Sequence, residues 1–296
     1  MRILLLHNPK AGREEHEGAE IVRELEKAGH DVCYRPADEM RDGLADPHFD
    51  VVVAPGGDGT VGKVARQLIH TGIPISVLPI GTANNLARTL GFNSSIDELA
   101  TNLKHGSVQK IDVGLAIGPW GHTFFFEGAG AGLLADYFRS PASVPKFESI
   151  SKHHEIREHL KGLSERLRDC QASEWSISVD TEDLSGRYLL WEAMNIRSVG
   201  PVLMLAPGAR TGDGRFDFIA VDEAHRAELA DYLHLRLNGQ EPVFPFPARR
   251  FKKMELWWQN SPIHFDDEVW PEQNGMRPEP CEIEIRVQAS ALWIWK

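Results

Sequence analysis

Cysteine is scarce in this sequence of 296 residues, and its three cysteines lie far apart. Cys33, Cys170 and Cys281 include no CxxC pair. An odd number of scattered cysteines without a signal peptide favours free thiols in a reducing cytosol over a disulfide framework. We therefore expect a cytoplasmic protein. Separately, a hydrophobic content of 42% is ample for a core.

Long apolar runs and an excess of basic residues are also missing. No run approaches the ~20 apolar residues of a membrane-spanning helix, so we expect a soluble protein. The 43 acidic residues outnumber the 32 Lys and Arg, giving a formal net charge of -11, which argues against a dedicated nucleic-acid-binding protein. His154 and His159 lack the four-residue spacing of a zinc protease motif. The basic run at residues 249–253 is either a contact for anionic headgroups or, more commonly, a solvated strand end.

The first third of the sequence alternates between apolar strands and amphipathic helices. Such alternation is typical of a parallel sheet with right-handed crossovers. The expected strands cover residues 1–6, 31–35, 50–54 and 75–78, and the expected helices cover residues 14–28, 60–70 and 84–90.

The pattern changes after Asp112, where many short strands follow one another with few helices. This is typical of an antiparallel sandwich. We therefore predict a first domain over residues 1–112 and a second over residues 113–291. The expected strands are 111–117, 123–127, 175–179, 188–193, 202–206, 216–221, 253–258, 263–266 and 281–287, and the expected helices are 148–168 and 224–237.

A glycine-rich loop at residues 55–60 (Pro-Gly-Gly-Asp-Gly-Thr) follows a strand and opens a helix. It is not a P-loop, because Val64 stands where that motif needs a hydroxyl for Mg²⁺. Glycines at a helix N-terminus expose backbone N–H groups that bind anions, although a tight turn is an equal reading of this loop alone. Two more polar loops, at residues 79–88 and 7–12, lie at the same sheet edge, where ligands bind. Together the three loops indicate a nucleotide site.

The ordered motifs resemble those of the diacylglycerol kinase catalytic family, which includes bacterial lipid kinases, sphingosine kinases and ceramide kinases and shares its nucleotide domain with NAD kinases. The GGDGT signature at residues 56–60 carries most of the resemblance. The other matching segments are Asn8-Pro9, residues 79–88, residues 112–114, the glycine segment 128–132, Asn195, Pro207, Asp213-Gly214 and Asp266-Asp267-Glu268.

The resemblance implies a fold, a nucleotide site and a metal requirement. The fold is an α/β nucleotide-binding domain with a parallel, NAD-kinase-like sheet, followed by an antiparallel β-sandwich domain, with residues 292–296 returning to the first domain. The implied cofactors are ATP and Mg²⁺. The implied nucleotide-binding residues are Asn8, Pro9, Lys10, Ala11, Gly12, Gly56, Gly57, Asp58, Gly59, Thr60, Gly81, Thr82, Asn84 and Asn85, with helix capping as the alternative role for one of the last two.

The resemblance also implies catalytic and metal-binding residues. Glu268 is the expected general base, Asp266 its partner or a metal ligand, and Asp58 the carboxylate that reaches a Mg²⁺ shell; a solvated turn is the alternative for the acidic run. A structural Mg²⁺ is expected at the side chain of Asp213 and the carbonyls of Arg210 and Arg215, unless this segment is a plain turn.

We therefore predict an ATP- and Mg²⁺-dependent kinase of a lipid hydroxyl, with a diacylglycerol-like acceptor. The alternatives are a kinase of a soluble alcohol or of NAD, and a nucleotide-binding regulator on a degenerate kinase scaffold. The regulator is suggested by Asp267 and Glu127, which stand where the family has glycine and often asparagine. The expected partners are a nucleotide, a lipid acceptor with transient contact to a membrane surface, and no nucleic acid. A homodimer is expected only as the commonest soluble oligomer.

Overall fold

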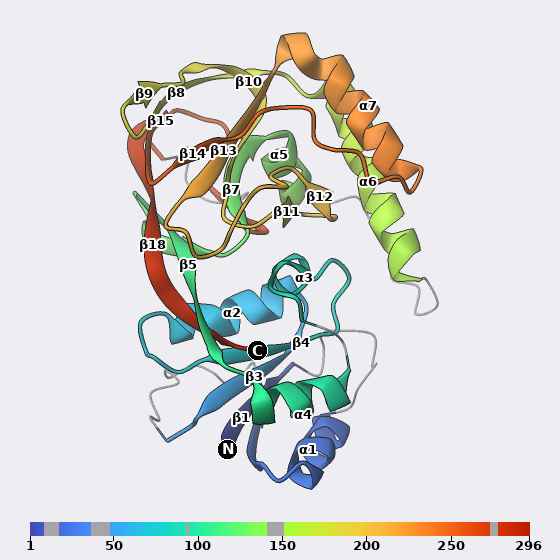
Figure 1. Ribbon diagram of the computed structural model, residues 1–296. Helices are drawn as coiled ribbons and strands as arrows, with labels where there is room; N and C mark the ends of the chain where they lie inside the picture. The colour runs from blue at the N-terminus through green and yellow to red at the C-terminus, as the bar shows by residue number, and fades with distance from the viewer. Residues whose placement is uncertain (9–17, 37–47, 93–94, 141–150, 273–277) are drawn as a thin grey trace. The chain divides into compact units, whose positions relative to one another are not determined.

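The computed structural model describes residues 1–8, 18–36, 48–92, 95–140, 151–272 and 278–296, which form two compact units (Figure 1). The first unit comprises Met1–Asp112 and Ala289–Lys296, and the second comprises Val113–Gln288. Two long strands, β5 (Val108–Gly118) and β18 (Cys281–Trp295), supply residues to both units. Among the described residues, no helix is long and apolar enough to cross a membrane.

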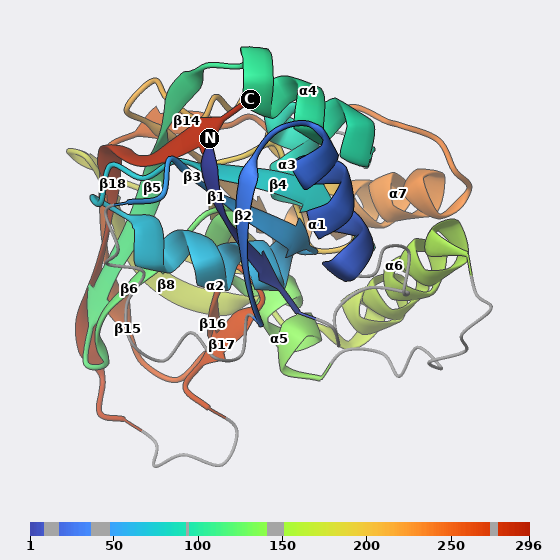
Figure 2. The ribbon, with the colours of Figure 1, turned by 90° about the horizontal axis from the view of Figure 1, so that it is seen from below.

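The first unit is a parallel sheet with helices on both faces. Its strands lie in the order β2–β1–β3–β4, with the end of β18 beside β4 through the pair Ile294 and Ile75. Helices α1 and α4 cover one face and α2 the other (Figure 2), so β3 and β4 are wholly buried. The elements are β1 (Arg2–His7), α1 (Gly18–Lys27), β2 (Asp31–Pro36), β3 (Val51–Gly56), α2 (Asp58–Leu68), β4 (Ile75–Pro79), α3 (Asn85–Leu90) and α4 (Ile96–His105).

The second unit is built on antiparallel strands. Its path runs β17–β16–β7–β10–β8–β15–β18, and β13 also pairs with β10. The strands are β6 (Gly121–Phe125), β7 (Gly128–Gly132), β8 (Ser173–Val179), β9 (Glu182–Asp183), β10 (Gly186–Met194), β11 (Ser198–Val199), β12 (Leu203–Met204), β13 (Phe216–Asp222), β14 (Arg249–Phe251), β15 (Lys253–Trp258), β16 (Ile263–Phe265) and β17 (Glu268–Trp270). The helices are α5 (Leu133–Arg139), α6 (Lys152–Asp169), the 3₁₀ turn Glu223–His225 and α7 (Arg226–Leu237).

Alternate residues of the second unit's strands enter two different cores. Trp191 of β10 and Phe218 of β13 pack into an aromatic core with side chains of β8, β15 and β16. Leu190 and Ile219, their neighbours along the same strands, pack instead against α5, α6 and α7. This period of two is the expected signature of strands that are covered on both faces.

The expected parallel and antiparallel strands are confirmed, but several elements differ from the sequence prediction. Helices α4 and α5 and the short strands β7, β14 and β17 were not predicted. The strand expected over residues 202–206 is only the two-residue β12, and β16 ends at Phe265, so Asp266 lies in a turn. The glycine segment 128–132 forms β7, a fully buried strand between β10 and β16.

Candidate active site

Two glycine loops touch each other at the edge of the first unit's sheet. The first loop (residues 56–60) leads from β3 into α2, and the second loop (residues 80–85) leads from β4 into α3. A Cβ atom on Gly81 would lie 2.3 Å from the Cα of Gly57, and one on Gly56 would lie 2.6 Å from the Cβ of Thr60. A side chain at Gly81 would push the two loops apart, and one at Gly56 would meet Thr60 within the first loop, so both positions require glycine.

Asp58 joins the two loops through its carboxylate. Its two oxygens accept hydrogen bonds from the backbone N–H groups of Asn85 (3.0 Å) and Leu86 (3.2 Å), in the first turn of α3. Those N–H groups have no partner within their own helix, so a carboxylate from the other loop serves as the cap. The side chain of Asn84, the N-cap residue of α3, forms no capping hydrogen bond itself.

Asn84 instead shapes the second loop from within. Its backbone is left-handed, with φ 51° and ψ 45°, a conformation that asparagine tolerates better than most residues. Its Oδ1 accepts from the N–H of Gly81 at 3.0 Å, and its Nδ2 donates to the carbonyl of Gly81 at 2.8 Å. These two bonds close the loop from within, without any ligand.

The remaining predicted nucleotide residues of the first unit lie near this pair of loops or fall outside the described residues. Gly59 is exposed in the first turn of α2, and Thr60 and Thr82 are half-buried. Asn8 directly follows β1, whose strand lies beside β3. Pro9, Lys10, Ala11 and Gly12 lie outside the described residues. The described part of the site is the N-terminus of α2, which has no side-chain cap, beside two loops held together by hydrogen bonds, and such a helix end is suited to an anion.

In the second unit, Asp266 is held by the backbone of a neighbouring segment. It forms the turn between β16 and β17, with a positive φ of 56°. Its carboxylate accepts from the N–H groups of Phe126 (3.0 and 3.1 Å) and Glu127 (2.8 Å), while its own N–H donates to the carbonyl of Gly128 at 2.8 Å. Glu268, two residues further on, is exposed at the start of β17.

Asn195 secures the same segment from a different strand. Its Nδ2 donates to the carbonyl of Phe126 at 2.9 Å, and its N–H donates to that of Glu127 at 2.9 Å. Asn195 and Glu127 are both buried. The segment 126–128 is therefore fixed between Asn195 and Asp266, which explains why these two motifs, far apart in sequence, belong together.

Asp267, in the family's glycine position, has no positive φ, so its side chain introduces no left-handed backbone strain.

A buried pair of titratable residues lies beside the hairpin that carries Asp266. The Nε2 atom of His264 lies 3.0 and 3.1 Å from the two carboxyl oxygens of Glu192, and its Nδ1 lies 2.8 Å from the carbonyl oxygen of Asp266. Burial raises the pKa of Glu192, with His264 acting in the opposite direction. Burial acts to lower the pKa of His264, but the neighbouring Glu192 makes the net direction upward. Sequence reasoning missed this pair, although a charged residue within the apolar strand Leu-Leu-Trp-Glu-Ala-Met was a usable signal.

The residues of the predicted structural metal site bond to other groups of the protein in this structure. The carboxylate of Asp213 forms an ion pair with Arg250 and accepts from the N–H of Arg215 at 3.1 Å. The carbonyl of Arg210 accepts from the N–H of Gly212 at 3.0 Å. In the described part of the chain, no group of three or more His, Cys, Asp or Glu side chains is arranged to hold a metal ion. The structural Mg²⁺ therefore stays a prediction.

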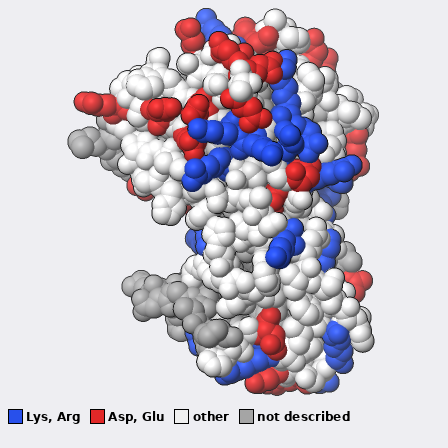
Figure 3. All heavy atoms as spheres, turned by 60° about the vertical axis from the view of Figure 1, so that its left-hand side comes forward, with Lys and Arg blue, Asp and Glu red and all other residues white. Residues whose placement is uncertain are grey.

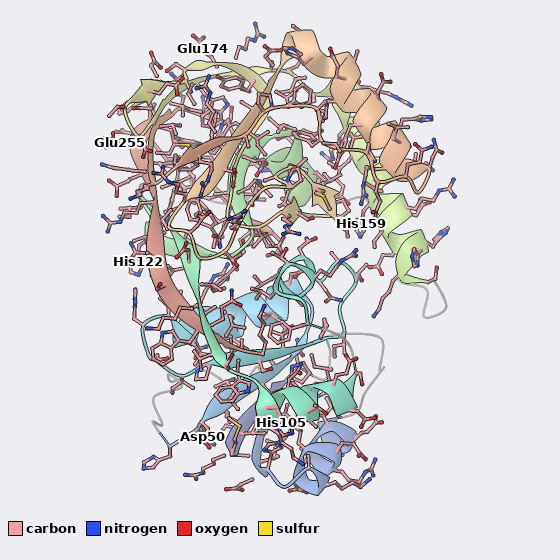
Figure 4. All side chains as sticks on the ribbon, viewed as in Figure 1. Asp50, His105, His122, His159, Glu174 and Glu255 are labelled. Carbon is pink, nitrogen blue, oxygen red and sulfur yellow. The ribbon has the colours of Figure 1, made fainter. Side chains whose placement is uncertain are left out.

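Within the described residues, the histidines of α6 belong to no group of three or more potential metal ligands. His159, labelled in Figure 4, lies on α6, where its Nδ1 contacts the hydroxyl of Tyr137 on α5. Burial lowers the pKa of His159 and raises the pKa of Tyr137 to about 12. A neutral imidazole that accepts a hydrogen bond from a protonated phenol is consistent with both directions. This contact joins two helices of the second unit.

Comparison with known proteins shows which proteins this sequence and fold resemble. Residues 2–116 match the diacylglycerol kinase catalytic domain. A diacylglycerol kinase of Bacillus subtilis (strain 168) is 28% identical over 250 residues, covering 81% of this chain and 80% of the relative. One from Staphylococcus saprophyticus is 26% identical over 255 residues, covering 82% of this chain and 80% of the relative.

Solved structures show the same fold over nearly the whole chain. The crystal structure of a putative diacylglycerol kinase from Bacillus anthracis str. Sterne aligns with a TM-score of 0.73 at 20% identity, covering 99% of this chain and 96% of that one. The chain is thus similar to diacylglycerol kinases in sequence and in fold, as the resemblance drawn from its motifs predicted.

Proposed function

We propose that this protein is a lipid kinase that transfers the γ-phosphoryl group of ATP to the hydroxyl of a diacylglycerol-like lipid. The observation that carries the proposal is the pair of glycine loops joined by Asp58 in a chain similar to diacylglycerol kinases. Two loops held together by hydrogen bonds, beside a helix N-terminus without a side-chain cap, suit the phosphates of a nucleotide, because phosphoryl transfer depends mainly on positioning and charge neutralisation. The predicted structural Mg²⁺ at Asp213 is not needed for this step.

In the first unit, Gly56–Thr60 and Gly81-Thr82 would line the phosphate site. The N–H groups of Thr60 and Gly81 are already bonded within the loops, so other backbone N–H groups of these segments would hold the phosphates. Close approach of the phosphates is possible at Gly56, Gly57, Gly59 and Gly81, because glycine carries no side chain. Mg²⁺ bound with ATP needs only one or two protein carboxylates, because it keeps waters and phosphate oxygens as its other ligands. Asp58 would supply one such carboxylate while it also holds α3, and Mg²⁺ would neutralise the charge that develops on the phosphate oxygens.

In the second unit, Glu268 would act as the general base. It would take the proton from the lipid hydroxyl as the oxygen forms a bond to the γ-phosphorus, and the bond to the bridging oxygen would break to release ADP. Glu268 is exposed and stands on a hairpin that is fixed by many hydrogen bonds. Asp266 directs its carboxylate at backbone N–H groups, so we assign it the role of positioning the hairpin.

Contact with a membrane surface would bring the protein to its acceptor. Figure 3 shows Lys and Arg side chains gathered on one face of the second unit, on the side of β14 and β15. The side chains of Arg249, Arg250 and Lys253 are each about half exposed. Each also forms an ion pair: Arg249 with Glu182, Arg250 with Asp213, and Lys253 with Glu255. We propose a cytoplasmic protein that attaches transiently to anionic lipid through this surface.

Vesicle sedimentation tests the membrane contact. Binding to phosphatidylglycerol vesicles at low salt should fall in the double variant Arg249→Ala/Lys252→Ala, and it should be absent with phosphatidylcholine alone. The control Lys27→Ala/Lys104→Ala removes two exposed charges from the first unit and should bind as wild type does. If both double variants lost vesicle binding equally, the proposal that this basic surface contacts the membrane would be wrong. The homodimer stays a prediction, and analytical ultracentrifugation of the protein would test it by measuring the mass in solution.

A phosphate-transfer assay tests the kinase itself. Labelled γ-phosphate from Mg-ATP is offered in parallel to a total lipid extract, to glycerol and to NAD, with wild type and Glu268→Gln. Label should enter lipid alone, and the variant should lose nearly all transfer while it still binds ATP. The control Glu282→Gln removes an exposed carboxylate on β18 and should keep wild-type activity. Label in glycerol or NAD, or ATP binding without transfer, would replace the lipid-kinase proposal.

A further inference from the structure

The buried pair Glu192 and His264 meets over a glycine. In the strand register, Gly130 of β7 pairs with Glu192 of β10 on one side and with His264 of β16 on the other. Neighbouring strands are about 4.8 Å apart, so the two side chains flank a position without a side chain. A Cβ on Gly130 would lie 2.3 Å from the Cδ of Glu192. Glycine at position 130 is therefore what allows the carboxyl group and the imidazole to bond.

The contacts of His264 define where its protons lie. The carbonyl oxygen of Asp266 only accepts hydrogen bonds, so Nδ1 must carry a proton to donate to it. The contact between Nε2 and the carboxyl of Glu192 then requires one more proton, on either partner. In both cases the pair is neutral as a whole, which is why its full burial is tolerated. The edge-on ring of Phe138, with its centroid 4.9 Å from that of His264, closes the remaining side.

His264 belongs to β16, and its side chain reaches the turn of the hairpin through the carbonyl of Asp266. His264 holds the carbonyl of Asp266, Gly128 holds its N–H, and Phe126 and Glu127 hold its carboxylate. The backbone of Asp266 is thus held from both sides in a left-handed turn. Glu268 lies two residues after Asp266 and is paired with Phe265 across the two-residue turn.

We infer that Glu192 and His264 are positioning residues that fix the direction of Glu268 through the carbonyl of Asp266. This inference rests on the proposed kinase function for its catalytic consequence. Loss of the pair releases one anchor of the turn, so Glu268 samples several positions. A displacement of about 1 Å at a reacting group costs up to about 100-fold in rate. The effect falls on kcat, and the KM for ATP stays unchanged because the nucleotide loops do not depend on this pair.

A double variant separates positioning from support of the fold. In Glu192→Met/His264→Phe both partners become apolar residues of similar size, so no buried polar group is left unpaired and the melting temperature returns close to wild type. The single variant His264→Phe leaves Glu192 without its partner and melts earlier. A pair that only supports the fold would recover activity together with stability. A positioning pair would leave kcat about 10- to 100-fold low in the double variant.

The conservative variant Glu192→Gln provides the rescue. Its amide still bonds to Nε2 of a neutral His264, which can still donate from Nδ1 to Asp266. We expect kcat within about threefold of wild type in Glu192→Gln, in contrast to the double variant. Wild-type kcat in the double variant would overturn the inference.

Amide hydrogen exchange gives a readout that does not depend on the reaction. The peptide that covers residues 263–270 should exchange faster in the double variant than in wild type, while β10 and β13 stay protected. Unchanged exchange in this hairpin would overturn the positioning role even if activity fell. If wild type transfers no phosphate to any acceptor, the proposed function fails, and the exchange of the hairpin still decides the inference.

Discussion

The carboxylate of Asp58 leads to a prediction that distinguishes a structural role from metal binding alone. It accepts two backbone hydrogen bonds that close the second loop onto the first. In Asp58→Asn the amide keeps one acceptor, and its NH₂ group faces a backbone N–H that it cannot satisfy. The variant should therefore be less stable even without nucleotide and without metal. A carboxylate that served only as a metal ligand would show no such loss in the apo protein.

The size of the loss follows from the two affected bonds. Hydrogen bonds to a charged group contribute about 1.5–3 kcal/mol each, and a donor left unpaired costs about 1–3 kcal/mol. Because Asp58 is only half-buried, water satisfies part of the lost bond, and we expect the lower end, about 1–2 kcal/mol. For a unit of this size the melting temperature should fall by roughly 4–8 °C, at about 4 °C per kcal/mol.

Differential scanning calorimetry in EDTA, with no nucleotide, measures this effect. The matched control is Asp31→Asn, which removes the same charge from the first unit at a side chain that is 81% exposed. The control should melt within about 1 °C of wild type, as most exposed substitutions do. An Asp58→Asn variant that melts with wild type, or above it, would refute the capping role and leave metal binding as the sole reason for this carboxylate.

Three further predictions concern other residues. Gly81→Ala should destabilise the protein by about 1–3 kcal/mol and weaken ATP binding, because its Cβ would meet the backbone of Gly57. The control is Gly208→Ala, where a Cβ meets nothing within 4 Å. Calorimetry should find its stability unchanged, and nucleotide titration should find its ATP affinity unchanged. Burial raises the pKa of Cys170 to about 11. Iodoacetamide at pH 8 should therefore leave Cys170 unmodified in the native protein and modify it in urea, as read by mass spectrometry. Rapid labelling of the native protein would contradict the burial of Cys170. The hydrogen bond to Asp222 raises the pKa of His225, so this contact stabilises the fold below the ordinary histidine pKa and is lost as pH rises through the folded value. NMR titration should find the raised pKa in wild type and a lower one in Asp222→Asn, and equal values would refute the contact.

The sequence predicted the parallel part of the fold and the position of the glycine loops. Buried parallel strands are near-continuous apolar runs, as in residues 51–54, and glycines mark the turns that follow them. The bond from Asp58 to α3 could not be predicted in the same way. It joins residues 27 positions apart, and nothing in the local pattern distinguishes a carboxylate that faces a phosphate from one that caps a neighbouring helix.

The glycine segment 128–132 shows where propensity fails. No strand was predicted over these residues, and glycine weakens strands, yet the segment forms the fully buried β7. The reason lies in the neighbouring strand, because Glu192 and Met194 occupy the space above Gly130 and Gly128. Such a demand comes from tertiary packing and has no local signature.

Glu268 and Asp266 were predicted only through the resemblance, and the structure separates what each does with its side chain. Asp266 is turned to the backbone of residues 126–127, while Glu268 is exposed on β17. The pair Glu192 and His264 had no motif at all. A histidine between two apolar residues in β16 becomes informative only when the register places it opposite Gly130.

The most direct test of the central claim is transfer of labelled phosphate from Mg-ATP to lipid by wild type and by Glu268→Gln. We predict a labelled lipid with wild type, nearly complete loss in the variant, and unchanged ATP binding in both. A labelled lipid that forms equally with the variant would remove Glu268 from the reaction. Absence of label from every lipid, with ATP still bound, would contradict the assignment of this protein as a lipid kinase.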